Sequence, residues 1–200
     1  MSTSVGRSGI DHIGVAVSFI VWDGSTSILM HRRGPACRDE RGTWDTGSGE
    51  VEYGEEPSAA VLREVFQEHG VKDQDLYQPP ILLRARSVVR EGTAEEPRSH
   101  WITFLHLVRV RERREVAVSE AERGHVEHPL WINPLNAPTV LPLHSQTATH
   151  IGIWMETLTP QQQSWMRQAA HQEKSEWFTR HLARLPLPDQ RALVEGLIVR

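Results

Sequence analysis

Residues 49–71 read GEVEYGEEPSAAVLREVFQEHGV, and this stretch carries the signals of one short helix. Pro57 suits the first turn of a helix, because its missing N–H has no partner there to lose. Gly70 suits the residue just past the end of a helix. We therefore expect a helix over residues 57–69.

One face of this expected helix is polar and carries two carboxylates. Glu64, Gln67 and Glu68 lie three or four residues apart in the sequence, so they share a helical face. The opposite face carries apolar side chains that can be buried: Ala59, Leu62 and Phe66. A packed helix with two carboxylates crowded on its front is typical of a binding surface for a hard cation.

Segments on both sides of the helix read as strands. Residues 10–21 are rich in β-branched side chains, residues 27–32 read as a second strand, and the turn signal between them predicts a hairpin. Residues 33–48 form a polar loop that leads into the helix. Beyond the helix, further strand-like or apolar runs cover residues 81–90, 101–110 and 129–133, and residues 111–125 read as a loop. Strands that flank a helix predict a mixed α/β or α+β sandwich.

The last third of the chain has a helical character. Residues 145–158 predict a helix, and the sequence TPQQ at 159–162 has the form of a capping box. The helix that starts there extends to about residue 185. The candidate apolar positions of this long helix are Trp165, Ala169, Trp177, Phe178 and Leu182. A final short helix ends near Gly196. We predict a flexible leader over 1–9, one domain over 10–158, and a helical extension over 159–200.

Composition excludes several classes of protein. The 200-residue chain has a net charge of −4, so no basic field argues for binding nucleic acid or an anionic membrane. Cys37 is the one cysteine, which excludes an internal disulfide and a thiolate zinc cluster. The sequence has no signal-peptide pattern, and no apolar run approaches the ~20 residues of a membrane helix. We expect a cytoplasmic protein that uses a metal.

The spacing within residues 49–71 resembles the signature of the Nudix hydrolases. Gly49 is followed by five residues and Glu55, then by seven residues and Arg63-Glu64, and the motif closes with Glu68 and Gly70. Gln67 departs from the motif, which has a glutamate there. Neighbouring stretches such as PLHSQ at 142–146 resemble a bacterial group of this family whose substrate is not assigned. The resemblance covers about residues 10–155 and implies an α/β/α sandwich with a mixed sheet, followed here by the C-terminal helical extension.

The resemblance implies hydrolysis of a nucleoside diphosphate linked to another moiety, with Mg²⁺ or Mn²⁺. Hard divalent ions neutralise pyrophosphate oxygens and lower the pKa of a bound water. By position in the motif, Glu64 and Glu68 are the implied catalytic residues and metal ligands. Ser48 is implied to offer its backbone carbonyl to the metal, and Gln67 keeps an oxygen donor but contributes no charge.

Other residues are implied to support the site or to bind the substrate. Arg63 and Glu55 are expected to pair and hold the loop against the helix, with Gly49 and Gly70 as further structural support. A late-loop acid often joins such sites, and we choose Glu127 over Glu120 and Glu122. Arg33 is a candidate for binding phosphate. Trp44 and Trp101 are candidates for stacking on a base, with core packing as the alternative. His69, His100, His125 and His128 have no metal-ligand spacing and are expected to be ordinary surface residues.

Two functions remain open at this point. The first is the metal-dependent pyrophosphohydrolase, with ADP-ribose-like compounds, nucleoside triphosphates and nucleotide sugars as substrate classes. The second is a non-catalytic Nudix-fold module that binds a nucleotide or regulates another protein, which Gln67 and the unmatched C-terminal residues favour. A homodimer is compatible with either function.

Overall fold

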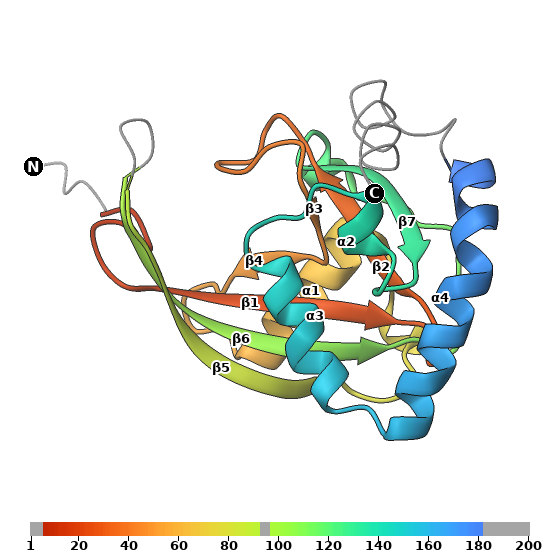
Figure 1. The fold of residues 1–200 in the computed structure, drawn as a ribbon. Helices are drawn as coiled ribbons and strands as arrows, with labels where there is room; N and C mark the ends of the chain where they lie inside the picture. The colour runs from red at the N-terminus through yellow and green to blue at the C-terminus, as the bar shows by residue number, and fades with distance from the viewer. Residues whose placement is uncertain (1–5, 93–96, 182–200) are drawn as a thin grey trace, which may run out of the picture.

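The computed structural model describes residues 6–92 and 97–181, and a mixed seven-stranded sheet lies at its centre (Figure 1). The strand order is β3-β2-β1-β6-β5, with β4 paired to β1 and β7 paired to β2. The strands are β1 (Gly14–Trp22), β2 (Ile28–Arg33), β3 (Trp44–Asp45), β4 (Ser48–Glu50), β5 (Ile81–Arg90), β6 (Ser99–Arg109) and β7 (Val126–Ile132). The helices are α1 (Pro57–His69), α2 (Ala137–Val140), α3 (Thr147–Glu156) and α4 (Pro160–His181), with short 3-10 turns η1 (Asp73–Asp75) and η2 (Glu120–Glu122).

Alternating side chains of β1 separate two hydrophobic layers. Phe19 and its odd-numbered neighbours Val17 and Val21 pack with Val61 and Val65 of α1. Even-numbered side chains such as Ile20 belong to a second core, with α3, the first half of α4 and residue 137 of α2. Helices thus cover both faces of the sheet, and Figure 1 shows α1 and α3 on opposite sides of it. The predicted α/β/α sandwich is confirmed.

The pairing of β1 changes along its length, and this creates an opening in the sheet. β1 runs parallel to β6 throughout, but it pairs with β2 at Val21 and Trp22. Towards its start, residues 16–18 of β1 pair instead with β4. The predicted hairpin of β1 and β2 is therefore present at its closed end, while the strands separate further on.

Helix α1 has the predicted bounds, but its buried face differs from the predicted one. Gly70 adopts the left-handed conformation (φ 67°), and its N–H donates to the Phe66 carbonyl, so the expected end of the helix is confirmed. The core side of the helix carries Ala60, Val61 and Val65, whereas Phe66 is 47% exposed and Ala59 is exposed. The predicted core face is wrong for Ala59 and Phe66, because the helix turns its carboxylate-bearing side inward, whereas Leu62 is partly buried and packs against the core.

Helix α4 begins at the predicted capping box. The Thr159 hydroxyl accepts from the backbone N–H of Gln162, and the Gln162 side chain accepts from the backbone N–H of Thr159. Met166 and Ala170 form its buried side, whereas Trp165 is 58% exposed, so the prediction of Trp165 as a core position is wrong. The predicted helix near Gly196 lies outside the described residues. Within the described parts of the chain, no helix is both long and apolar enough to cross a bilayer.

Candidate active site

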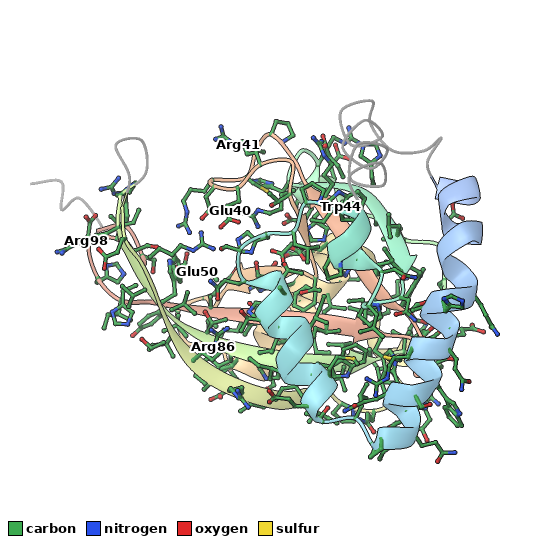
Figure 2. The ribbon with its side chains drawn as sticks, in the orientation of Figure 1. Glu40, Arg41, Trp44, Glu50, Arg86 and Arg98 are labelled. Carbon is green, nitrogen blue, oxygen red and sulfur yellow. The ribbon has the colours of Figure 1, made fainter. Side chains whose placement is uncertain are left out.

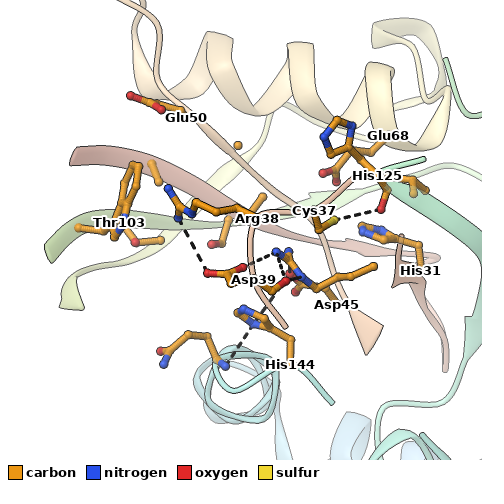
Figure 3. Close-up of a pocket in the computed structure, with 18 of the residues that line it drawn as sticks. His31, Cys37, Arg38, Asp39, Asp45, Glu50, Glu68, Thr103, His125 and His144 are labelled. Atoms are coloured by element: carbon orange, nitrogen blue, oxygen red, sulfur yellow. Dashed lines mark hydrogen bonds and ion pairs between the residues drawn. The ribbon is translucent and has the colours of Figure 1, made fainter. Parts of the chain in front are cut away.

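A half-open pocket of about 470 Å³ lies where β1 and β2 separate, a size typical of small-molecule sites (Figure 3). Figure 3 shows Glu68 below α1 on one side of the pocket and His144 on the opposite side, with Asp39 and Asp45 between them. The charged and aromatic residues that line it include Glu50, Glu68, Glu122, Arg33, Arg38, Arg90 and Trp101. The pocket thus combines carboxylates, guanidinium groups and an aromatic ring.

Glu64 is held against β4 by a position that has room for glycine alone. A Cβ atom on Gly49 would lie 2.0 Å from both Cδ and Oε1 of Glu64. Glu64 itself is 7% exposed. Burial raises the pKa of Glu64, although a hydrogen bond from Arg63 opposes this rise. Gly49, which lines the pocket, therefore allows the carboxylate to approach the strand directly behind it, although Glu64 is not among the described residues that line the pocket.

Arg63 connects the helix to the preceding loop and strand. Its Nε and NH2 atoms donate to the two carboxylate oxygens of Glu55 at 2.9 and 2.8 Å, so the predicted pairing is present. NH2 also donates to the Glu50 carbonyl at 2.9 Å. NH1 donates to Glu64 and, at 3.3 Å, to the side-chain oxygen of Gln67. Arg63 thereby fixes the positions of two oxygen-bearing side chains on the helix.

Glu68 is a buried carboxylate without a cationic partner among the described residues. It is 7% exposed, and its Oε2 atom has no hydrogen-bond partner within the described chain. Burial raises the pKa of Glu68 well above its usual value, and the nearby Glu64 raises it further, while the backbone N–H of Ser48 opposes the rise. Because an uncompensated buried charge is costly, a divalent cation fits this carboxylate better than an empty interior does.

A pair of buried histidines lies beside Glu68. Nδ1 of His31 and Nε2 of His69 are 3.1 Å apart, and the rings meet edge to face. His69 is 1% exposed, so its prediction as an ordinary surface residue is wrong. Burial lowers the pKa of His31 to about 4 and the pKa of His69 well below its usual value. Burial alone would raise the pKa of Asp45, but electrostatic interactions with the neighbouring His144 and with the Arg33 guanidinium hold it below its usual value.

The late-loop acid that faces the pocket is Glu122. Glu127 forms an ion pair with Arg32 at 2.8 Å and is absent from the described residues that line the pocket. Glu122, on η2, lines the pocket and is close enough to raise the pKa of both Glu64 and Glu68. The pairing of β7 with β2 places residue 127 opposite Arg32, so the geometry favours Glu122 over the predicted Glu127 as the late-loop acid at the pocket.

The predicted substrate-binding residues have different surroundings from those expected. Trp44 is fully buried in the core and cannot stack on a base (Figure 2), which corrects its prediction as a substrate contact. Trp101 lines the pocket instead, with the Arg38 guanidinium 5.1 Å from its ring centroid. Arg33 lines the pocket, but Asp39 (2.6 Å) and Asp45 (3.4 Å) already compensate its charge.

Sequence reasoning ranked Glu122 below Glu127, and it missed Arg38 and the histidine pair as residues in or beside the pocket. Glu122 is brought to the pocket by a loop that contacts α1, since the Ser119 N–H donates to the Gln67 carbonyl at 2.9 Å. No local sequence pattern predicts such a contact. For His69, a usable signal existed, because a residue directly after Glu68 points towards the sheet once Val61 and Val65 are recognised as the buried side.

A helix that presents one buried carboxylate to a half-open pocket, with a second packed beside it, defines a class of protein suited to hold a divalent cation next to a small substrate. The model described as the NUDIX domain matches residues 12–155, and the chain belongs to the Nudix family. By family, the chain is a Nudix pyrophosphohydrolase, as the motif predicts. A comparison with curated proteins gave no match.

Solved structures share this fold. The NUDIX domain of Shewanella oneidensis NrtR, complexed with ADP ribose, aligns with a TM-score of 0.60 and 15% identity, covering 78% of this chain and 95% of that chain. MutT NUDIX hydrolase from Burkholderia pseudomallei gives 0.52 and 23%, covering 70% and 97%. The E. coli dihydroneopterin triphosphate pyrophosphohydrolase gives 0.51 and 20%, covering 68% and 91%. At these identities the likeness shows the fold.

Proposed function

We propose that this protein is a metal-dependent hydrolase that cleaves the pyrophosphate of a nucleoside diphosphate linked to another moiety. The observation that carries the proposal is the buried carboxylate of Glu68, which lies beside Glu64 and has an oxygen without a partner among the described residues. Two adjacent buried carboxylates at the edge of a pocket are stable in ionised form when a cation joins them.

Mg²⁺ or Mn²⁺ is the proposed cation, because both prefer oxygen ligands. Glu64, Glu68 and the Ser48 backbone carbonyl would hold it, and Glu122 takes the role first given to Glu127. Gln67 would add a neutral oxygen. When bound, the ion supplies charge neutralisation of the pyrophosphate oxygens and lowers the pKa of a water molecule.

The chain's own residues would move the proton and orient the substrate. Burial raises the pKa of Glu64 and of Glu68, which makes each a stronger base once ionised. Either carboxylate would accept the proton of the attacking water. Arg63 would keep Glu64 in place through its contacts with Glu55.

Arg38 and Trp101 are the proposed substrate contacts. Arg38 has a 58% exposed side chain and lies 3.9 Å from Asp39, a weaker contact than those of Arg33, so its charge is more available to a phosphate. The Trp101 ring offers a surface on which a base can stack. ADP-ribose-like compounds, nucleoside triphosphates and nucleotide sugars are the substrate classes to compare.

The test is turnover of these compounds by the purified protein with Mg²⁺ or Mn²⁺, followed as release of phosphate or nucleoside monophosphate. Glu68→Gln should abolish most turnover while the protein stays folded. Glu156→Gln is the matched control, because Glu156 is an exposed helical glutamate that contacts Arg84 and should leave turnover unchanged. Tight nucleotide binding with no turnover of any compound would favour the non-catalytic module instead.

Three further expectations from the sequence stay predictions: the domain boundaries at 9 and 158, a homodimer, and a cytoplasmic location. The first half of α4 bears on the second boundary. Asn133 and Asn136 donate side-chain hydrogen bonds to the carbonyls of Met166 and Ala170, and Met166 belongs to the core of the sheet. Truncation after residue 158 should therefore destabilise the domain, which thermal melting would measure.

A further inference from the structure

The inner side of the site holds a second group of metal-ligating side chains. His31 on β2 and Glu68 and His69 at the end of α1 each offer one ligand atom, and these atoms all lie within 4.8 Å of one another. We propose that these three residues bind a divalent transition-metal ion of the zinc class, at a site separate from the magnesium or manganese ligands around Glu64. This site shares Glu68 with the proposed function but does not require hydrolysis.

The spacing of the two imidazoles suits a shared ion. Nδ1 of His31 and Nε2 of His69 are 3.1 Å apart. Two nitrogens bound to one zinc ion at about 2.0–2.1 Å in tetrahedral geometry lie about 3.3–3.4 Å apart. The rings therefore need to separate by only a few tenths of an ångström, and the Glu68 side chain can rotate to complete the set.

Unpartnered buried atoms give an independent indication of a ligand. Glu68 Oε2 and His69 Nδ1 have no hydrogen-bond partner among the described residues. The hydrogen bond between the two histidines uses Nε2 of His69. It therefore satisfies neither the Nδ1 atom of His69 nor the Oε2 atom of Glu68. A buried polar atom without a partner destabilises the fold. An ion bound to Glu68 removes the cost of its unpartnered oxygen.

The surroundings allow an ion to enter and hold the ligands in place. His31 and Glu68 line the pocket, so an ion reaches them from solvent (Figure 3), while His69 is 1% exposed and is not among the residues that line the pocket. The Phe19 ring packs edge to face against His69, with ring centroids 5.8 Å apart. Asp45 lies opposite His31 in the β2–β3 register and adds negative charge. Two histidines and one glutamate, with a fourth position open to the pocket, form a ligand set that zinc accepts.

The ligand chemistry separates this site from the proposed magnesium site. Imidazole nitrogen suits zinc and similar ions, whereas Mg²⁺ prefers oxygen ligands. Excess Mg²⁺ should therefore fail to displace an ion from the histidines. Because both sites use Glu68, the nitrogen ligands His31 and His69 are what distinguish the zinc-class site in a measurement.

The test uses the full chain without a histidine tag, titrated with Co²⁺ as a probe for zinc and followed by its visible absorption. We expect one equivalent of Co²⁺ to bind with the intense bands of a four- or five-coordinate site. His31→Gln and His69→Gln should each weaken Co²⁺ binding by at least about 10- to 100-fold, because changes to the groups that merely support a ligand already cost that much. His106→Gln is the matched control, since His106 is also buried but its ring contacts the Phe104 carbonyl on β6.

Each outcome decides the proposal, including failure of a variant to fold. Unchanged Co²⁺ binding in both folded variants, or loss of the bands in 100-fold excess Mg²⁺, would overturn it. If the variants do not fold, X-ray absorption of the zinc-loaded wild type still tests it, because scattering from two imidazoles is expected and its absence refutes the site. Glu64→Gln separates the two proposals: it should lose turnover and keep the Co²⁺ spectrum.

Discussion

Replacing Gly49 by alanine should damage cation binding more than folding. The added Cβ would lie 2.0 Å from Cδ and Oε1 of Glu64, where ordinary contact begins at 3.4 Å, so the carboxylate must move by 3.4 − 2.0 = 1.4 Å. The atoms that it meets belong to the end of a flexible side chain, and the backbone of Gly49 is not in the left-handed region. The chain can therefore accept the alanine by displacing Glu64, at about 1–3 kcal/mol of stability.

The same displacement has a larger effect on a bound cation. Moving a carboxylate oxygen from about 2.1 to about 3.5 Å costs about 6 kcal/mol for the two charges of a divalent ion, at an effective dielectric constant near 20. This corresponds to roughly a 10⁴-fold loss of affinity. We expect Gly49→Ala to melt cooperatively, to bind Mn²⁺ roughly 10⁴-fold more weakly in calorimetric titration, and to lose turnover at limiting metal.

Gly152→Ala provides the matched control for this experiment. Position 152 lies within α3, and a Cβ there meets nothing within 4 Å among the described residues. Alanine in a helix should raise stability by about 0.5–1 kcal/mol and leave metal binding unchanged. A folded Gly49→Ala protein with wild-type affinity for Mn²⁺ would show that Glu64 does not hold the ion.

Three other changes test separate parts of the structure. Gln67→Glu should leave turnover equal or raise it, because the Gln67 oxygen already accepts from Arg63 at 3.3 Å and a glutamate fits there; a sharp drop in kcat would contradict the position given to it. Trp101→Ala should raise KM about 10-fold with little change in melting temperature, because this ring lines the pocket. Trp44→Ala should cost about 3–5 kcal/mol of stability, because this ring is in the core. The reverse pattern would mean that Trp44 contacts the substrate and Trp101 stabilises the core. Burial lowers the pKa of His150 from 6.5 to about 4, so the unfolded chain binds the proton more tightly than the folded chain does. The free energy of unfolding is therefore unaffected by this histidine above pH 6.5, and it falls by up to about 3 kcal/mol as the pH drops to 4 and below. His150→Gln should remove this part of the acid sensitivity in thermal melts from pH 7 to 4, and an unchanged profile would assign it elsewhere.

Local signals predicted the parts of the site that depend on local structure. Pro57 and Gly70 define the ends of α1 because both act within one helical turn, and the predicted bounds of 57–69 match the structure. The Arg63–Glu55 pair also spans only eight residues. These features need no knowledge of the rest of the fold.

The residues that sequence reasoning misplaced are those whose positions depend on contacts between distant segments of the chain. Trp44 follows a polar stretch of sequence, yet it begins β3, and its backbone N–H donates to the Pro142 carbonyl while the ring lies in the core. The contact between residues 119 and 67 brings Glu122 to the pocket, whereas the register of β7 on β2 pairs Glu127 with residue 32. A sequence pattern of a few residues contains no information on such pairings, so the choice among several late acids had no local basis.

The burial of Glu68 links stability to function. An ionised carboxylate there opposes folding, since burial raises its pKa well above the usual value; the cation-free protein should therefore lose stability as pH rises through that raised pKa. Glu68→Gln should remove this loss and make the cation-free protein more stable than the wild type at neutral pH. Wild type should regain stability with a divalent cation, by about 2.7 kcal/mol at 100 times the dissociation constant. For a chain of this length that gain raises the melting temperature by about 5–11 °C. An equal rise in melting temperature for wild type and Glu68→Gln on adding the cation would mean that the ion binds elsewhere. A rise in the wild type alone would show that this glutamate destabilises the cation-free fold and binds the cation.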